Sequence, residues 1–208
     1  MRLLVSGATR SLARAVAEYP DAFGKLLTPA NRNSLAWAGA DGRPWAVDNG
    51  CFHRFDEARF RRLVARAAGK PGLLWVAAPD VVADARATLA RWSEWAPELR
   101  AAGVPLAFVG QDGAEDLPLP WEDMAALFVG GSTRWKLSQA SADLGLEAKR
   151  RGLLLHMGRV NSRRRLLAAY GRGCDTVDGT GMSKWGDRHL PKFARWLAEI
   201  QGYPAPMF

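Results

Sequence analysis

The segment LAFVGQDG, residues 106–113, shows the pattern from which we predict the fold of this chain: a short apolar run followed by a polar ending. Such a run, bounded by turn residues, is typical of a strand buried on both faces in a parallel sheet. Similar runs recur along the chain, and stretches with the helical spacing of apolar residues lie between most of them. This alternation favours a parallel sheet covered by helices.

We predict eight buried strands, at Leu3–Val5, Ser34–Trp37, Trp45–Val47, Leu73–Ala77, Leu106–Val109, Leu127–Val129, Leu153–Leu155 and Cys174–Val177. Helices are predicted at Asp56–Ala68, Val81–Ala102, Ser138–Arg151, Ser162–Tyr170 and Leu190–Ile200. The number of strands favours a closed barrel over an open sheet. We therefore expect an α/β protein, a compact single-domain TIM-like (β/α)8 barrel over residues 1–208, with some units abbreviated.

The charge balance points to a polyanionic partner. The chain has 29 Lys and Arg against 21 Asp and Glu, a formal net charge of +8 and a pI near 10.1. Such an excess attracts nucleic acid, although a proteome rich in arginine gives the same balance. The two cysteines, Cys51 and Cys174, suggest neither a disulfide framework nor a zinc site. No stretch has the run of apolar residues that a bilayer span or a signal peptide needs, so we expect no membrane partner and a cytoplasmic location.

The opening segment, residues 3–14, resembles the first strand-turn-helix of short-chain dehydrogenases. A dinucleotide-binding turn needs several glycines, whereas only Gly7 is present here. Those enzymes also carry a catalytic tyrosine with a lysine four residues on, but Tyr170 is followed at that distance by Cys174. The sequence therefore disfavours an oxidoreductase, and Thr9 or Ser11 is better explained as a helix cap.

Polar residues collect at the carboxyl ends of the predicted strands. Six consecutive strands run into Asp48-Asn49-Gly50, Pro79-Asp80, Gln111-Asp112-Gly113, Gly130-Gly131-Ser132, His156-Met157-Gly158-Arg159 and Asp178-Gly179-Thr180-Gly181. Barrel enzymes carry their catalytic residues at this rim, because all the strands end there.

Each of these segments alone has a structural explanation: residues 48–50 are typical of a turn, Asp80 of a helix cap and residues 130–131 of a tight loop. Together they favour a site, because acids gathered on one rim repel one another. Two neighbouring carboxyl groups also acquire separate pKa values, so that one can act as a nucleophile and the other can transfer protons.

In order and spacing these segments resemble the tRNA-guanine transglycosylase superfamily, and most of all its DNA-acting deazapurine-in-DNA branch, from about residue 47 to residue 185. The family's Asp-Ser-Gly-Gly-Phe segment is resembled by residues 48–52, which implies that Asp48 handles protons or aids base exchange and that Phe52 stacks on the base. Its Gly-hydrophobic-Asp-x-x-Asp run is resembled by residues 173–178. This match implies that Asp178 is the nucleophile.

The resemblance also implies a set of base-binding residues: Asp80 and Gln111 read the edge of the base, and Gly130, Gly131 and Met157 complete its site. The tRNA enzymes carry a cysteine-rich zinc-binding extension after the nucleophile, for which this sequence supplies no ligands. The histidines His53, His156 and His189 are isolated in the sequence. We therefore expect no metal and no cofactor, and DNA in place of tRNA as the substrate.

The implied chemistry is cleavage of the bond between a nucleobase and its sugar in DNA. Asp178 attacks the anomeric carbon to form a sugar ester, and the target base must first leave the helical stack. A cationic cluster is predicted to hold the DNA backbone through Arg159, Arg163, Arg164, Lys184 and Arg188. The alternative for Arg163–Arg165 is a solvated helix start.

Three functions remain open at this point. Attack of water on the ester makes the protein a DNA glycosylase that excises a modified base, which would suit defence against phages with modified DNA. Attack of a free base makes it a transglycosylase that exchanges guanine for a 7-deazaguanine derivative. We favour excision, since so short a chain has little material for a lid that excludes water. The third function is a non-catalytic DNA-binding barrel.

Overall fold

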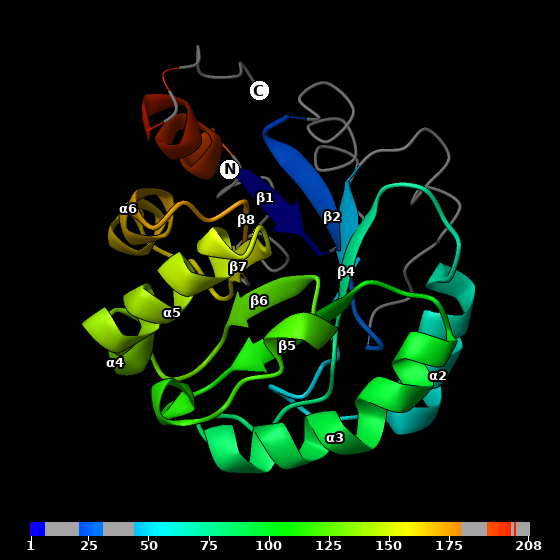
Figure 1. Cartoon of the computed structure of the whole chain (residues 1–208). Helices are drawn as coiled ribbons and strands as arrows, with labels where there is room; N and C mark the ends of the chain where they lie inside the picture. The colour runs from blue at the N-terminus through cyan, green and yellow to red at the C-terminus, as the bar shows by residue number, and fades with distance from the viewer. Residues whose placement is uncertain (7–20, 31–43, 180–190, 201, 203–208) are drawn as a thin grey trace.

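The computed structural model describes residues 1–6, 21–30, 44–179, 191–200 and 202, and these form a closed barrel (Figure 1). Each strand pairs in parallel with its neighbours in the chain, and β8 pairs with β1. The strands are β1 (Arg2–Val5), β2 (Phe23–Leu27), β3 (Trp45–Val47), β4 (Leu73–Ala77), β5 (Leu106–Gly110), β6 (Ala126–Val129), β7 (Leu154–Met157) and β8 (Thr176–Asp178). The predicted TIM-like (β/α)8 barrel is confirmed.

Helices follow the strands and cover the outside of the barrel (Figure 1). They are α2 (Glu57–Ala67), α3 (Ala85–Ala101), α4 (Thr133–Lys136), α5 (Gln139–Arg150) and α6 (Arg163–Gly171), with short 3-10 turns η1 (Ala114–Asp116) and η2 (Trp121–Asp123) and a helix over residues 191–200. Each of the five named α-helices begins after an Asp or Ser side chain that accepts a backbone N–H, at Asp56, Asp84, Ser132, Ser138 and Ser162. These caps satisfy backbone donors that a helix start leaves free, so each helix begins at a defined residue.

Two apolar layers hold the barrel together, because successive residues of a strand face opposite sides. The interior is filled by Leu4, Leu26, Ala46, Trp75, Ala77, Ala107, Val109, Ala126 and Phe128. The alternate strand residues pack outward against the helices, as Phe108 does against Trp92 of α3, with ring centroids 5.5 Å apart. Beyond this interior layer, polar residues stand at the carboxyl ends of the strands, among them Asp80 after β4, Gln111 after β5 and Asp178 in β8.

The second strand of the barrel is β2, which was not predicted and which pairs directly with β1 and β3. The strand predicted at Ser34–Trp37 lies outside the described residues. The run FGKLL was missed because Gly24 and Lys25 interrupt its apolar character. Gly24 is required there, since a Cβ would lie 2.6 Å from Leu4 Cδ2 and 2.7 Å from the Pro44 carbonyl oxygen.

Among the helices of the described segments, none combines the length and apolar character that a membrane crossing needs.

Candidate functional site

A cavity of about 1000 Å³ opens at the carboxyl ends of the strands. Its wall includes residues from six consecutive strand ends: Asp48, Asn49 and Gly50 after β3, Asp80 after β4, Gln111 after β5, Gly130 and Gly131 after β6, Gly158 and Arg159 after β7, and Asp178 in β8. The structure thus brings together both predicted catalytic aspartates and most of the predicted base-binding residues.

Asp178 is held by partners on both of its carboxyl oxygens. Oδ2 lies 3.0 Å from His156 Nε2, and Oδ1 accepts the backbone N–H of Arg159 at 3.0 Å. Burial, the largest single influence, opposes ionisation, but the His156 contact, the Arg159 N–H and the ammonium of Lys136 together lower the pKa of this carboxyl below its ordinary value. Asp178 is therefore ionised at neutral pH, the state that a nucleophile needs.

Asp48 has the opposite electrostatic character. Burial raises its pKa to about 7, against the hydrogen bond that Oδ1 accepts from the Gly50 N–H at 3.0 Å. The negative charges of Asp178 and Asp80 raise it further. A carboxyl that titrates near neutrality can both give and take a proton during turnover.

Asp80 lies at the centre of a buried hydrogen-bond network. Its Oδ1 accepts from Asn49 Nδ2 at 2.8 Å, and its Oδ2 accepts from Gln111 Nε2 at 2.6 Å. Gln111 Oε1 in turn accepts the backbone N–H groups of Ala83 and Gly131, both at 2.9 Å. Both acceptor positions of that amide oxygen are therefore occupied, so toward a ligand Gln111 offers its remaining N–H and Asp80 its remaining lone pairs.

The glycines at the strand ends allow side chains to approach the backbone closely. A Cβ on Gly130 would lie 2.8 Å from Gln111 Nε2, and one on Gly131 would overlap the Trp135 ring. Gly131 also has a φ of +63°, which favours glycine. Its carbonyl oxygen accepts from Arg159 Nη2, so a base that binds this carbonyl must first displace the arginine.

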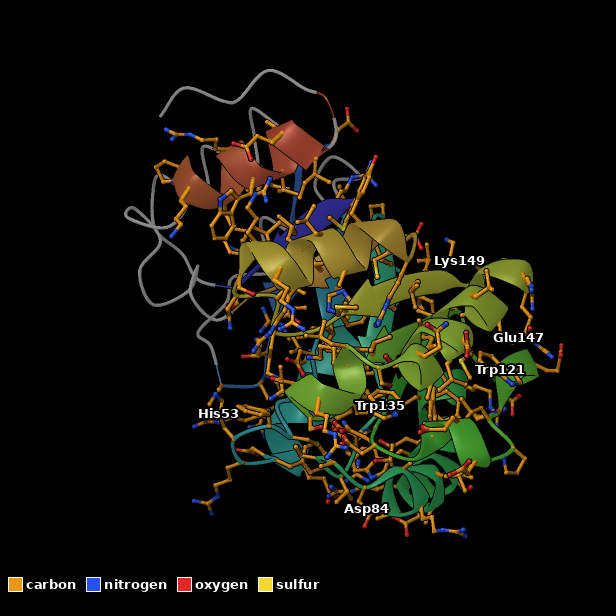
Figure 2. All side chains as sticks on the ribbon, turned by 90° about the vertical axis from the view of Figure 1, so that its left-hand side faces the viewer. His53, Asp84, Trp121, Trp135, Glu147 and Lys149 are labelled. Atoms are coloured by element: carbon orange, nitrogen blue, oxygen red, sulfur yellow. The ribbon has the colours of Figure 1, made fainter. Side chains whose placement is uncertain are left out.

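An aromatic ring and a guanidinium group stand at the mouth of the cavity. Phe52 is 50% exposed, and Arg159 Cζ lies 4.4 Å from the centroid of its ring. A planar cation therefore covers one face of Phe52, and a base that stacks on that face has to take its place. In Figure 2 the neighbouring His53 projects at the edge of the molecule, whereas Trp135 lies within its body.

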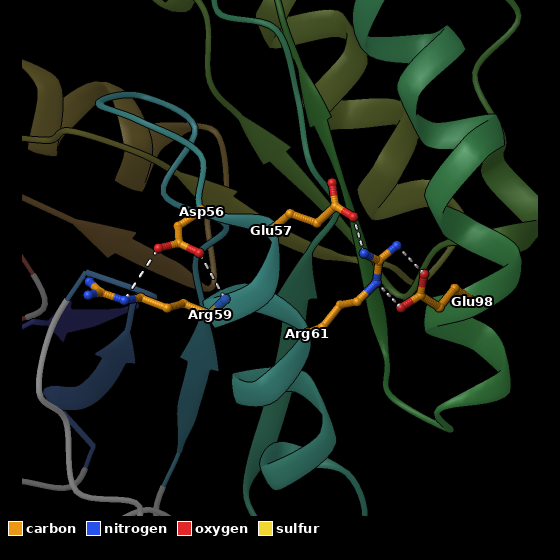
Figure 3. Close-up of polar contacts among 5 residues, drawn as sticks. All are labelled: Asp56, Glu57, Arg59, Arg61 and Glu98. Carbon is orange, nitrogen blue, oxygen red and sulfur yellow. Dashed lines mark hydrogen bonds and ion pairs between the residues drawn. The ribbon is translucent and has the colours of Figure 1, made fainter.

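Polar contacts fix the start of α2, which follows the segment that carries Phe52, and join this helix to α3; Figure 3 shows these contacts. Asp56 Oδ1 accepts the backbone N–H of Arg59 at 3.0 Å, and Asp56 Oδ2 lies 3.3 Å from Arg59 Nε. Further along the helix, Arg61 contacts Glu57 of its own helix and binds both carboxyl oxygens of Glu98 in α3, at 2.8 and 2.9 Å. Because Asp56, Glu57 and Arg59 line the cavity, these contacts define its outer wall.

Met157 does not line the cavity, so the prediction that it binds the base is wrong. It is fully buried in the layer between barrel and helices. Since strand residues alternate, the neighbouring His156 faces the interior and Gly158 lines the cavity, while Met157 points the other way.

The predicted backbone-binding cations are placed only in part. Arg159 lies at the cavity, and Arg163 and Arg164 are exposed at the start of α6, where Arg163 Nε lies 3.6 Å from Glu199. Lys184 and Arg188 lie outside the described residues. Within those residues, no three His, Cys, Asp or Glu side chains form a group that could hold a metal ion.

Sequence reasoning missed two buried residues beside the site. His156, which is isolated in the sequence, contacts Asp178 across the β7–β8 pair. Lys136 of α4 donates to the Gly158 carbonyl, and burial together with Arg159 lowers its pKa to about 7. The signal that the sequence offered for His156 was its place at a predicted strand end, two residues before Gly158, whereas its register with Thr176 of β8 appears only in the structure.

No protein-family model matches the sequence, and no curated protein is similar to it. A chain from the tryptophan synthase α2β2 complex of the hyperthermophile Pyrococcus furiosus shares 16% identity at a TM-score of 0.58, over 97% of this chain and 96% of that one. A chain from a structure of native KDPGal shares 12% identity at a TM-score of 0.51, over 97% and 95%. At such low identity these likenesses extend to the barrel fold alone.

Proposed function

We propose that this protein is an enzyme that cleaves the N-glycosidic bond between a modified base and its sugar in DNA. The observation that carries the proposal is a pair of carboxyl groups in one cavity with opposite protonation behaviour. Asp178 is held ionised, whereas Asp48 keeps its proton up to a pH of about 7. Glycosyl transfer with a covalent intermediate requires such a pair, one group as nucleophile and the other as acid and then base.

The first step forms the sugar ester. A carboxylate oxygen of Asp178 bonds to C1′ as the bond from C1′ to the base nitrogen breaks, and its electron pair leaves with the base. Asp48 in its neutral form gives its proton to that base, which departs uncharged. The transition state has oxocarbenium character, so the negative charge of Asp178 stabilises it as well.

The second step releases the enzyme. Asp48, now ionised, takes a proton from a water molecule whose oxygen attacks C1′, and the bond between C1′ and Asp178 breaks. The products are the free base and an abasic sugar, and both carboxyl groups return to their starting states. If a second base attacks in place of water, the same residues perform base exchange.

Recognition of the base is proposed to use Asp80, Gln111 and Phe52. Asp80 offers acceptors and Gln111 one N–H donor, a combination that fits a base edge with more donors than acceptors. Phe52 offers a stacking face once Arg159 has moved from its ring. Arg159 at the cavity and Arg163 and Arg164 at the start of α6 are proposed to bind the phosphates of the DNA strand next to the flipped nucleotide.

The test is incubation with DNA duplexes and single strands that carry normal and modified bases, followed by mass spectrometry of the released bases and of the strands. Abasic strands support excision, and strands with a different base support exchange. If no DNA of any kind loses a base, the enzyme proposal is wrong and the non-catalytic DNA-binding barrel takes its place.

The variant Asp178→Asn keeps the size of the side chain but removes the nucleophile. We expect base release to fall by more than about a thousandfold while DNA affinity stays within a factor of about three. A matched Asp175→Asn substitution changes an acid near the amino end of β8, where Asp175 binds Lys149 at 2.8 Å, and should leave base release intact. Full activity of Asp178→Asn would exclude the nucleophile assigned here.

A further inference from the structure

We infer that His156 is a positioning residue for Asp178: its ring orients the carboxylate through a relay that runs from Thr176 through His156 to Asp178. The inference rests on the proposed function for its catalytic meaning. The contact itself is a property of the folded chain, so it can be tested without any substrate.

The relay is continuous across two neighbouring strands. His156 Nδ1 lies 2.8 Å from Thr176 Oγ1, and His156 Nε2 lies 3.0 Å from Asp178 Oδ2. His156 of β7 is in register with Thr176 of β8, so both contacts follow from the pairing of these strands. The second oxygen of Asp178 is bound by the Arg159 N–H, which leaves the carboxylate little freedom to rotate.

The ring of His156 is enclosed by aromatic side chains. Its centroid lies 4.7 Å from that of Trp75 and 4.4 Å from that of Phe128, and the residue has no exposed surface. Burial lowers the pKa of His156, against the influence of Asp178, so the ring is neutral and has a single N–H. Because Asp178 is ionised, we assign this N–H to Nε2, and Nδ1 then accepts the hydroxyl proton of Thr176.

His156 gives Asp178 a fixed hydrogen-bond donor, which stabilises the ionised carboxylate. Without such a donor, burial would favour the neutral acid. Three further charged or titratable groups face this carboxyl: Lys136 from α4, Arg159 from the loop after β7 and Asp48 from the end of β3. Of these, the cations lie on the Gly158–Arg159 side, whereas His156 supplies the donor from within the barrel. Without that donor, Asp178 should take up a proton at a higher pH.

The test follows the titration of Asp178 directly by carboxyl carbon NMR, with its resonance assigned by comparison with Asp178→Asn. His156→Phe retains an aromatic ring but removes the donor, and His156→Gln retains an N–H near the position of Nε2. We expect the midpoint of Asp178 to rise by about one pH unit or more in His156→Phe and by less than half of that shift in His156→Gln. An unchanged midpoint in His156→Phe would overturn the inference.

Thr176→Val keeps the ring and removes only the hydroxyl donor, so it serves where His156→Phe fails to fold. It should raise the midpoint of Asp178 by roughly half a pH unit, because the ring can then turn its N–H away. No shift in a folded Thr176→Val would count against the relay.

Base release measured across pH on the same proteins adds a functional readout. We expect the acid limb of the pH profile of kcat to move with the NMR midpoint of Asp178. If the unaltered protein releases no base, the proposed function is wrong, but the NMR titration still tests the contact between His156 and Asp178.

Discussion

Asp48 and Asp178 face the same cavity, yet their surroundings drive them to different charge states. Asp178 has a ring nitrogen and a backbone N–H on its two oxygens. Asp48 accepts from the backbone N–H of Gly50 and has two acids nearby. At the scale of single residues, the division of roles follows from the balance of donors and acids around each carboxyl.

The raised pKa of Asp48 predicts how stability depends on pH. Between pH 3.8, its ordinary value, and about 7 the folded chain holds a proton that the unfolded chain has lost, so stability falls as pH rises through this window. Asp48→Asn has no such titration. We expect it to be more stable than the unaltered protein at pH 8, by about 2 kcal/mol after allowance for solvent in the cavity, and to lose this advantage at pH 4. Urea unfolding at both pH values provides the measurement, and an advantage independent of pH would contradict the assignment.

At position 158, neighbouring side chains leave no room for a residue larger than glycine. A Cβ there would overlap the Phe128 ring and lie 3.3 Å from Asp178 Oδ2. We expect Gly158→Ala to destabilise the protein by about 1–3 kcal/mol, through displacement of Phe128. Thermal unfolding measures this loss. The control is Gly171→Ala, at an exposed glycine of α6 where a Cβ would have no atom within 4 Å, which should be neutral or slightly stabilising. Equal effects of the two substitutions would show that crowding at Gly158 is not the cause.

At the scale of elements, the carboxyl rim is held by contacts that join successive strand ends. Asp112 after β5 accepts both the N–H and the hydroxyl of Ser132, each at 2.6 Å, and Ser132 caps α4. Lys136, at the end of α4, then donates to the carbonyl of Gly158 after β7. The short helix α4 thus links three strand ends, and its position determines where Gly131 and Arg159 lie.

Lys136 gives this link a characteristic pH dependence. Burial lowers its pKa to about 7, so between pH 7 and 10.5 the unfolded chain binds a proton that the folded chain does not, and stability rises with pH across this window. Lys136→Met fills a similar volume without a charge. From pH 7 to 10, we expect the free energy of unfolding of the unaltered protein to rise by about 2–4 kcal/mol relative to that of Lys136→Met. Denaturant unfolding at the two pH values measures it, and a constant difference would mean that the lysine stays charged in the fold.

At the scale of the whole molecule, the chain has an excess of cationic side chains and a net charge of +8. Some of these cations lie at the cavity and others lie elsewhere on the barrel. Arg159 and Arg164 lie at or near the carboxyl rim, whereas the exposed Lys70 precedes β4 at the opposite end of the barrel. Under the proposed function, we expect the first of these two groups, and not the second, to contact a DNA strand that enters the cavity.

The salt dependence of DNA binding tests this division. In an Asp178→Asn background, which prevents turnover, Arg159→Ala and Arg164→Ala should each reduce the slope of log K against log salt by about 0.7–0.9. Lys70→Ala should leave the slope unchanged. Fluorescence anisotropy at several salt concentrations gives these values. A loss of slope in Lys70→Ala as large as in Arg159→Ala would place the DNA on a different face.

The barrel class and the polar rim could be predicted from the sequence, because strand periodicity, turn residues and helix caps act between residues close in the chain. The prediction missed β2, in which Gly24 is explained by the close approach of Leu4 and Pro44. It also could not decide the direction of Met157, which depends on the strand's orientation in the closed barrel. The contact of His156 with Asp178, 22 residues away, could not be predicted, because strand register and barrel closure bring these side chains together. Closure of the barrel buries both Asp48 and Asp178, but the pKa of Asp48 is raised and that of Asp178 is lowered. The proposed chemistry depends on this difference.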